Sequence, residues 1–353
     1  MPETELTLGE IHALARDCLA GNGCDAANAE AVAATVTAAE RDGAVSHGLF
    51  RLPGYVAALR SGKVDGAAAP VVERLSPALL RVDGGGGFAP GALQAGIPAL
   101  AEAAHATGVA ALAVVRAHHF AALWHETEAL AERGLAALAC TAYMPAVAPA
   151  GAREALFGTN PISFAWPRPG DTPVVFDMAT AAMAMGEVQI AARDGHAVPP
   201  GTGLNAAGEA TTDPAAIAGG GVLLPFGGYK GSAVSLMVEL LAAALLGERF
   251  SFEAAAADNK DGGPPRGGEF ILALSPNWMA AGGPESGADT EAEADAGAGR
   301  DWAQHAAGLF ERIGQLDGAR LPGARRHHRR QDAGPRAVNA ALVGKIRGLC
   351  EAR

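Results

Sequence analysis

Gly84-Gly-Gly-Gly-Phe-Ala89 is the stretch that decides the fold class of this chain. It follows a strand-like run, Leu79–Val82, and precedes a helical run, Ala89–Thr107, so it fits the G-x-G-x-x-A pattern of a dinucleotide-binding Rossmann turn. The fit is weak, because four consecutive glycines satisfy many patterns. The acidic residue expected about twenty positions further on is missing, since the next strand-like run ends at Val115-Arg116. We therefore favour a plain glycine-rich turn between a strand and a helix, with the Rossmann fold as the alternative.

The residues around this turn, from about 70 to 275, predict a mixed α/β region in which short β-type runs and helical runs follow one another. The β-type runs are Leu79–Val82, Val109–Val115, Ala136–Thr141, Ile162–Trp166, Val174–Asp177 and Glu269–Leu274. The helical runs between them are Ala89–Thr107, Ala121–Arg133 and Ser232–Leu246.

Both ends of the chain have helical patterns. Residues 6–65 begin with Thr7-Leu-Gly-Glu10, which is typical of a capping box, and two further helices are expected at Asp301–Gln315 and about Ala337–Cys350. Residues 281–299 are small, acidic and rich in glycine, so we interpret them as a mobile surface loop. We divide the chain into residues 1–68 (N-terminal helical region), 69–275 (mixed α/β region) and 276–353 (acidic loop and C-terminal helices).

The composition excludes several classes of protein. The 353 residues are 49% hydrophobic, which is typical of a globular enzyme, and the net charge of −11 argues against general affinity for nucleic acids. No secretory signal is visible, and the longest apolar run, Val234–Leu246, contains Glu239 and is too short to span a membrane. The four cysteines include no CxxC pair, so we expect free thiols, no metal site and a cytoplasmic protein.

The segment Ser46-His-Gly-Leu-Phe-Arg51 carries the first candidate chemistry. We interpret Ser46 as the N-cap of a helix that Pro53 would kink, which would place His47 and Arg51 on one face. A proton donor beside a bidentate carboxylate clamp suits the reduction of a C=O or C=N bond next to a carboxylate. A solvent-exposed His/Arg pair is the alternative that the local pattern leaves open.

Three later turns carry polar residues: Gly158-Thr-Asn-Pro161, Asp177-Met-Ala-Thr180 and Pro225-Phe-Gly-Gly-Tyr-Lys-Gly-Ser232. The last two precede helical patterns, where backbone N–H groups favour phosphates. Each turn alone is more often structural than functional.

Together, these motifs resemble the malate/L-lactate dehydrogenase-type family of NAD(P)H-dependent oxidoreductases over about residues 5–275 and 302–350. The matching elements are Ser46–Arg51, His118-His-Phe-Ala-Ala-Leu123, Leu156-Phe-Gly-Thr-Asn-Pro161, Asp177-Met-Ala179, Thr211-Thr-Asp-Pro214 and Leu224–Gly231. The chain is more similar still to the branch of Δ1-piperideine-2-carboxylate/Δ1-pyrroline-2-carboxylate reductases, through His119–Trp124, Asn160–Pro167, Gly186–Gly195 and Asp258–Glu269.

The resemblance implies an α/β fold with a non-Rossmann mixed sheet that binds NAD(P)H, a helical domain formed from both chain ends, and a homodimer. It implies that His47 is the proton donor, that Ser46 and Glu187 form its relay, and that Arg51 and Thr159 bind the substrate. The implied cofactor-binding residues are His119, Phe120, Ala121, Ala122, Leu123, Asp177, Met178, Ala179, Gly228, Tyr229, Lys230, Arg320, Arg325 and Arg326.

The basic residues Arg320–Arg326 favour NADPH over NADH, because the planar guanidinium fork fits a 2′-phosphate. The implied reaction is reduction of a cyclic 2-imino carboxylate to L-pipecolate or L-proline, in lysine- and proline-related amino-acid catabolism. An NAD(P)-dependent 2-hydroxy acid dehydrogenase of the same family, of the malate, lactate or ureidoglycolate type, is the alternative. The expected partner is a small carboxylate substrate, with neither nucleic acid nor membrane.

Overall fold

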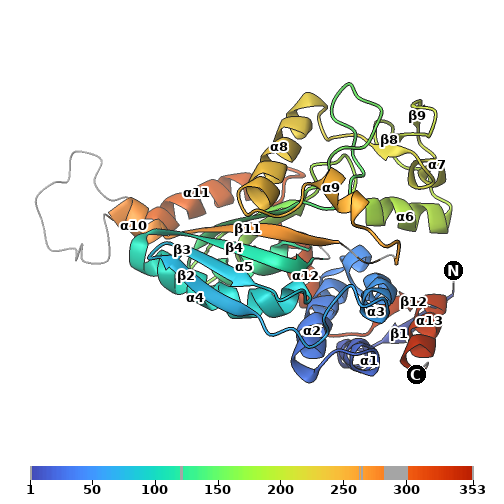
Figure 1. Cartoon of the computed structure of the whole chain (residues 1–353). Helices are drawn as coiled ribbons and strands as arrows, with labels where there is room; N and C mark the ends of the chain where they lie inside the picture. Colours follow the sequence, from blue (N-terminus) through green and yellow to red (C-terminus); the bar gives the residue numbers. More distant parts are fainter. Residues whose placement is uncertain (1, 120–121, 262, 264, 282–300, 352–353) are drawn as a thin grey trace, which may run out of the picture.

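The computed structural model describes residues 2–119, 122–261, 263, 265–281 and 301–351. Its centre is a seven-stranded sheet with the order β2-β3-β4-β11-β5-β6-β7 (Figure 1). The strands are β2 (Val71–Ser76), β3 (Leu79–Asp83), β4 (Val109–His118), β5 (Ala136–Thr141), β6 (Ile162–Trp166), β7 (Val174–Met178) and β11 (Arg266–Leu274). All six predicted β-type runs form strands of this sheet, whereas the pattern did not predict β2.

The sheet is mixed, which confirms the mixed α/β part of the predicted fold class and excludes the Rossmann alternative. β3 and β4 pair in parallel and are joined by α4 (Ala89–Thr107), but β11 runs antiparallel to β4. The turn at Gly84–Ala89 is a plain connection between β3 and α4. Its Gly86 has a φ of +81°, and a Cβ on Gly87 would lie only 2.5 Å from the Cβ of Ala68. The glycines therefore serve a tight backbone turn against a neighbouring loop.

The strands bury alternate residues on the two faces of the sheet. On β11, Ile271 and Ala273 pack in a core with α4 and α5 (Trp124–Ala131), whereas Phe270 packs toward Val238 of α8 (Tyr229–Glu239). This period of two matches strand geometry. Figure 1 shows the result, with α4 and α5 below the sheet and α8 above it. A π-helical turn, η3 (Leu240–Ala244), continues α8 across the same face.

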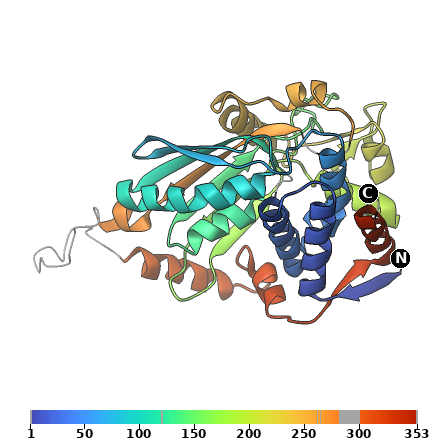
Figure 2. The same ribbon diagram turned by 60° about the horizontal axis from the view of Figure 1, so that its bottom comes forward.

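The two chain ends pack together at one end of the molecule (Figures 1 and 2). β1 (Glu3–Leu6) pairs antiparallel with β12 (Arg336–Asn339), and α1 (Leu8–Gly21) packs against both α2 (Ala26–Asp42) and α13 (Ala340–Glu351). The capping box at Thr7 is confirmed, since Thr7 Oγ1 accepts from the Glu10 amide at 3.2 Å and Glu10 accepts from the Thr7 amide at 2.8 Å. The predicted last helix begins later than expected because β12 precedes it.

The remaining elements lie mostly on the α8 side of the sheet (Figure 1). They include α6 (Met185–Asp194), α7 (Pro214–Ala218), α9 (Ser251–Ala256) and a small sheet of β8 (Gly203–Leu204), β9 (Ala210–Thr211) and β10 (Val222–Leu223). The C-terminal part also contains α10 (Pro276–Ala281), α11 (Trp302–Gly314) and α12 (Ala324–Arg330). Nearly all of the predicted acidic loop, residues 282–299, falls outside the described residues.

Residues 45–60 correct one expectation. In place of a helix capped by Ser46, two 3-10 turns, η1 (Val45–His47) and η2 (Leu49–Arg51), precede α3 (Leu52–Arg60). Gly48 separates the turns, with a φ of −89° and a ψ of −138° that no helix adopts. Pro53 lies in the first turn of α3, where proline is well accommodated, so it does not kink a helix.

Candidate active site

A cavity of about 910 Å³ opens between the turns η1 and η2, helix α6 and the ends of β6 and β7. Nine predicted site residues line it: Ser46, His47, Arg51, Thr159, Asp177, Met178, Ala179, Glu187 and Arg326. They come from five separate parts of the chain. The fold therefore brings together the predicted proton donor, its relay partners, both predicted substrate-binding residues and part of the predicted cofactor site.

Two hydrogen bonds fix the Ser46–Arg51 segment at the cavity wall. The Ser46 hydroxyl lies 3.0 Å from His47 Nδ1, and Arg51 Nε donates to the Ser46 carbonyl at 2.8 Å. These bonds engage His47 Nδ1 and Arg51 Nε, and both residues line the cavity. His47 and Arg51 thus line the same cavity. They do so because two successive 3-10 turns place them there, and not because they lie on one face of one helix.

The surroundings of His47 favour its neutral form. Burial, together with the positive charges of Arg51 and His119, lowers the pKa of His47 to about 3. The N-terminus of the α-helix expected at Ser46 makes no contribution to the pKa of His47, because no α-helix begins at Ser46. The imidazole is therefore neutral at pH 7 while the cavity holds no anion, and a negative charge bound at Arg51 would raise its pKa.

Helix α6 forms the opposite wall and approaches the histidine segment closely. A Cβ on Gly186 would lie 2.9 Å from Arg51 Nη2 and 3.3 Å from the Cβ of Ser46. The absence of a side chain at this position lets Glu187, in the first turn of α6, reach the cavity. Sequence reasoning named Glu187 and missed Gly186, because a helical glycine gives no signal until its neighbours are known.

Asp177 and Arg326 line the side of the cavity toward β7. Burial raises the pKa of Asp177 to about 7, and its carboxylate accepts from the Trp124 amide at 3.1 Å. Arg326 of α12 lies with its guanidinium 5.3 Å from the Trp124 ring and donates to the Val175 carbonyl at 3.1 Å. One residue of the basic stretch is therefore held at the cavity by cation–π and hydrogen-bond contacts.

The other predicted cofactor-binding residues that the structure describes do not line the cavity. Ala122 and Leu123 are buried, and Gly228, Tyr229 and Lys230 are exposed at the start of α8. Arg320 is exposed before α12, and Arg325 is exposed within it. Phe120 and Ala121 lie outside the described residues. Further lining residues that sequence reasoning did not name include Trp124, Tyr143 and Met183. Of these three residues, Trp124 lies within a stretch that carried the resemblance, and Tyr143 and Met183 do not.

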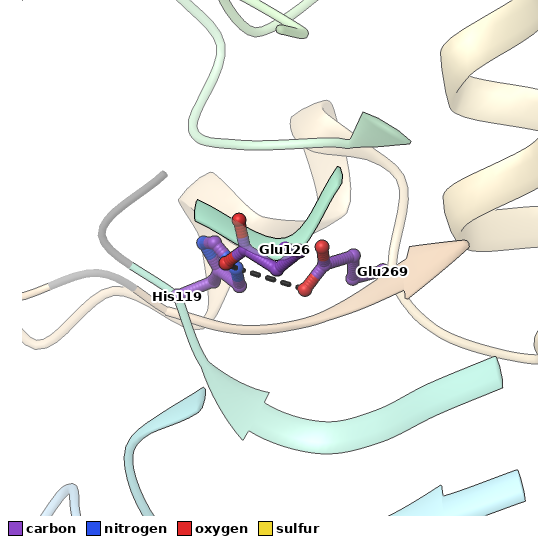
Figure 3. Close-up of side chains that lie close together, drawn as sticks. All are labelled: His119, Glu126 and Glu269. Carbon is purple, nitrogen blue, oxygen red and sulfur yellow. Dashed lines mark ion pairs between the residues drawn. The ribbon is translucent and has the colours of Figure 1, made fainter. Parts of the chain in front are cut away.

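His119 is partly buried in a separate cluster with two buried carboxylates (Figure 3). Its Nε2 lies 2.8 Å from Glu269 Oε2 of β11 and 3.7 Å from Glu126 Oε1 of α5. These three side chains come close enough to share a metal ion. However, the two carboxylates raise the pKa of His119 to about 10, so a metal ion would have to displace a firmly held proton. The geometry favours an ion pair.

Comparisons with known proteins give matches over nearly the whole chain. A profile of the malate/L-lactate dehydrogenase family matches residues 6–334. The Δ1-pyrroline-2-carboxylate reductase of Ancylobacter novellus is 45% identical over 98% of this chain and 97% of its own. The Δ1-pyrroline-2-carboxylate/Δ1-piperideine-2-carboxylate reductase of Pseudomonas putida is 45% identical over 97% of this chain and 95% of its own.

Solved structures show the same fold. The crystal structure of Δ1-piperideine-2-carboxylate reductase from Pseudomonas syringae pv. tomato superposes with a TM-score of 0.87 at 42% identity, covering 98% of this chain and 99% of that one. In the part of the chain that the structure describes, no helix has the length and apolarity needed to cross a membrane.

Proposed function

The chain belongs to the malate/L-lactate dehydrogenase family, and we propose that it reduces cyclic 2-imino carboxylates. Its substrates would be Δ1-piperideine-2-carboxylate, giving L-pipecolate, and Δ1-pyrroline-2-carboxylate, giving L-proline. The observation that carries the proposal is the shared cavity of His47 and Arg51, in a chain whose relatives are named for these two substrates. We place the reaction in lysine- and proline-related amino-acid catabolism.

Arg51 supplies the carboxylate clamp in this proposal. Its Nε is committed to the Ser46 carbonyl, so the remaining guanidinium N–H groups can meet the substrate carboxylate. Thr159, on the facing wall, supplies a hydroxyl to the same space. A carboxylate held at these two points presents the adjacent C=N carbon in one orientation. Holding the reacting carbon in a fixed geometry lowers the barrier to hydride transfer.

His47 supplies the proton. The Ser46 hydroxyl orients Nδ1, which leaves Nε2 toward the substrate. Burial is the main cause of the lowered pKa of His47, and the Arg51 charge adds to it, so a substrate carboxylate bound at Arg51 offsets the charge part and raises that pKa. Glu187 lies on the same cavity, and its negative charge would stabilise the imidazolium.

The cavity suits a nicotinamide cofactor, which supplies the hydride when bound. A volume of about 910 Å³ is large for a small imino acid alone, and the wall includes Arg326 and the apolar Met178 and Ala179. Arg326 would hold a phosphate, with the exposed Arg320 and Arg325 nearby in sequence, and this supports NADPH over NADH. The remaining predicted cofactor-binding residues do not line the cavity and would lie around the cofactor beyond it. They are the partly buried His119, the buried Ala122 and Leu123, and the exposed Gly228–Lys230.

A substrate panel tests the function. Oxidation of NADPH is followed with the two cyclic imines and with pyruvate and oxaloacetate, and then repeated with NADH. We expect kcat/KM for an imine to exceed that for either 2-oxo acid by orders of magnitude. A preference for a 2-oxo acid would instead establish the 2-hydroxy acid dehydrogenase alternative.

We also propose that the protein is a homodimer and that its chain divides functionally at about residues 68 and 275. Exposed apolar side chains on α8, η3 and α9, namely Leu236, Leu240, Leu245 and Phe252, support an interface there. Sedimentation equilibrium should give twice the monomer mass of 35.4 kDa. A monomer over the micromolar range would overturn this part of the proposal.

A further inference from the structure

Glu239 is the acidic residue that interrupts the longest apolar run of the sequence, and the structure gives it a role that the family resemblance does not. We propose that Glu239 is a positioning residue that holds the Thr159 turn at the correct place in the cavity. This inference rests on the proposed function, because it takes Thr159 as a substrate contact.

Glu239 lies at the junction between α8 and the π-helical turn η3, and only 4% of it is exposed. Single π-helical turns inside helices occur often near functional sites. The carboxylate is fully occupied by donors from two other segments. Its Oε1 accepts from Asn160 Nδ2 at 2.8 Å and from the Ser251 hydroxyl at 2.5 Å, and its Oε2 accepts from the Ser251 amide at 3.0 Å.

These bonds reach both neighbours of Thr159. Asn160 follows Thr159 directly, is fully buried, and has a φ of +40°, in the left-handed region that asparagine adopts more readily than most residues. Gly158 precedes Thr159, and its amide donates to the Ser251 hydroxyl at 2.9 Å. The turn is therefore tied on one side through Asn160 and on the other through Ser251, and both ties end at Glu239.

Helix α8 also fixes the Thr159 carbonyl. Thr180 donates to that carbonyl through its amide at 2.9 Å and its hydroxyl at 3.1 Å, and Ser235 donates to the Thr180 hydroxyl at 2.7 Å. Asn160 Nδ2 makes a further bond to the Ser235 carbonyl at 3.2 Å. Two hydrogen bonds thus hold the Thr159 carbonyl directly, and two more tie its neighbours to α8, while the Thr159 side chain lines the cavity.

Only a carboxylate satisfies this arrangement. Every group that faces the two oxygens is a donor, so an amide in place of the carboxylate would turn its own N–H₂ toward another donor. Glu239→Gln keeps the shape of the side chain but removes one of the two hydrogen-bond acceptors. The turn should then shift, and Thr159 and Arg51 should no longer meet one carboxylate together.

The test compares Glu239→Gln with Glu253→Gln, a matched change on exposed α9, where the carboxylate caps a helix without contacting the turn. We expect Glu239→Gln to lower kcat/KM for the imine about 10- to 100-fold, mainly through KM, because small misplacements at a reaction centre have effects of this size. The dissociation constant of NADPH for Glu239→Gln should change less than about twofold, well below that loss. The kcat, the KM and the NADPH dissociation constant of Glu253→Gln should change as little.

Ser251→Ala provides a second variant if Glu239→Gln does not fold. It removes the tie to Gly158 and keeps the tie to Asn160, so a smaller rise in the imine KM is expected. An unchanged imine KM in either folded variant, or equal rises for imine and NADPH, would overturn the proposal. A wild-type enzyme that prefers a 2-oxo acid would overturn the proposed function instead, and the KM for that acid then becomes the readout for Glu239.

Discussion

His47 and His119 are two histidines shielded from bulk water near one active site, and their surroundings hold them in opposite charge states. His47 follows a serine, lies beside the Arg51 guanidinium and has its pKa lowered to about 3. His119 lies between Glu126 and Glu269 and has its pKa raised to about 10. Burial lowers the pKa of both, so the difference comes from the neighbouring charges.

The comparison shows which histidine is available for chemistry. His119 is held as a cation by its carboxylate neighbours and is not among the residues that line the active-site cavity, so it does not supply the proton. His47 faces the cavity and has no carboxylate within ion-pair distance among the described residues. An incoming substrate carboxylate can therefore change the protonation of His47, whereas nothing that enters the cavity replaces the partners of His119.

Replacing His47 should have the largest effect. We expect His47→Gln to lower kcat/KM for the imine by about 10²- to 10⁴-fold, the usual contribution of a general acid, with NADPH binding unchanged. His119→Gln should keep most of the activity per folded molecule. Steady-state kinetics on both purified variants check this, and equal losses would remove the distinction between the two histidines.

Arg51→Lys should have the next largest effect. Lysine keeps the charge but cannot bond the Ser46 carbonyl and a carboxylate with one planar fork. We expect kcat/KM to fall about 10- to 100-fold, corresponding to the loss of one charge-assisted hydrogen bond. The measurement is the substrate KM at saturating NADPH, and a KM equal to that of the wild type would show that the carboxylate is bound elsewhere.

Gly186→Ala should act through Arg51. The new methyl group would lie 2.9 Å from Arg51 Nη2, so the guanidinium must shift to accommodate it. We expect about a tenfold loss of kcat/KM, since displacement of a positioning group by a fraction of an ångström has effects of this order. Gly308→Ala on α11, where a Cβ would meet open space, is the control. Equal activities of the two variants would contradict the close approach of α6.

The smallest effect concerns the pH dependence of stability. Because the folded pKa of His119 lies above its unfolded value, protonation of His119 contributes stability that is complete below about pH 6.5 and is lost as pH rises toward about 10. His119→Gln should be less stable than the wild type at pH 7, and its stability should fall less between pH 7 and pH 10. Urea unfolding at several pH values measures this. Parallel stability curves would mean that His119 is not charged in the folded protein.

The sequence predicted most of the central sheet, because strands buried on alternate faces carry a strong local pattern. It also predicted the residues of the cavity that belong to contiguous motifs, such as Ser46–Arg51. The helix expected at Ser46 does not form, because Gly48 adopts a non-helical conformation and the Leu49 amide donates to the Glu40 carboxylate of α2 at 2.7 Å. Both features depend on how this segment packs against α2, which the local sequence pattern does not show.

Contacts between distant segments could not be predicted from local patterns. Gly186 matters only because Arg51 lies against it, and Glu239 matters only because Asn160 and Ser251 converge on it. The same holds for His119, whose partners Glu126 and Glu269 are 7 and 150 residues away in the sequence. Residues of this kind need the fold before their role can be seen.

A histidine-ring NMR titration tests the contrast between the two histidines most directly. The protein is labelled with carbon-13 histidine, and the two resonances are assigned by their loss in His47→Gln and His119→Gln. We predict that His47 stays neutral down to pH 5 in the free protein, and that His119 stays protonated up to pH 9. Two resonances that both titrate near the ordinary histidine pKa of about 6.5, or in the reverse order, would contradict this account.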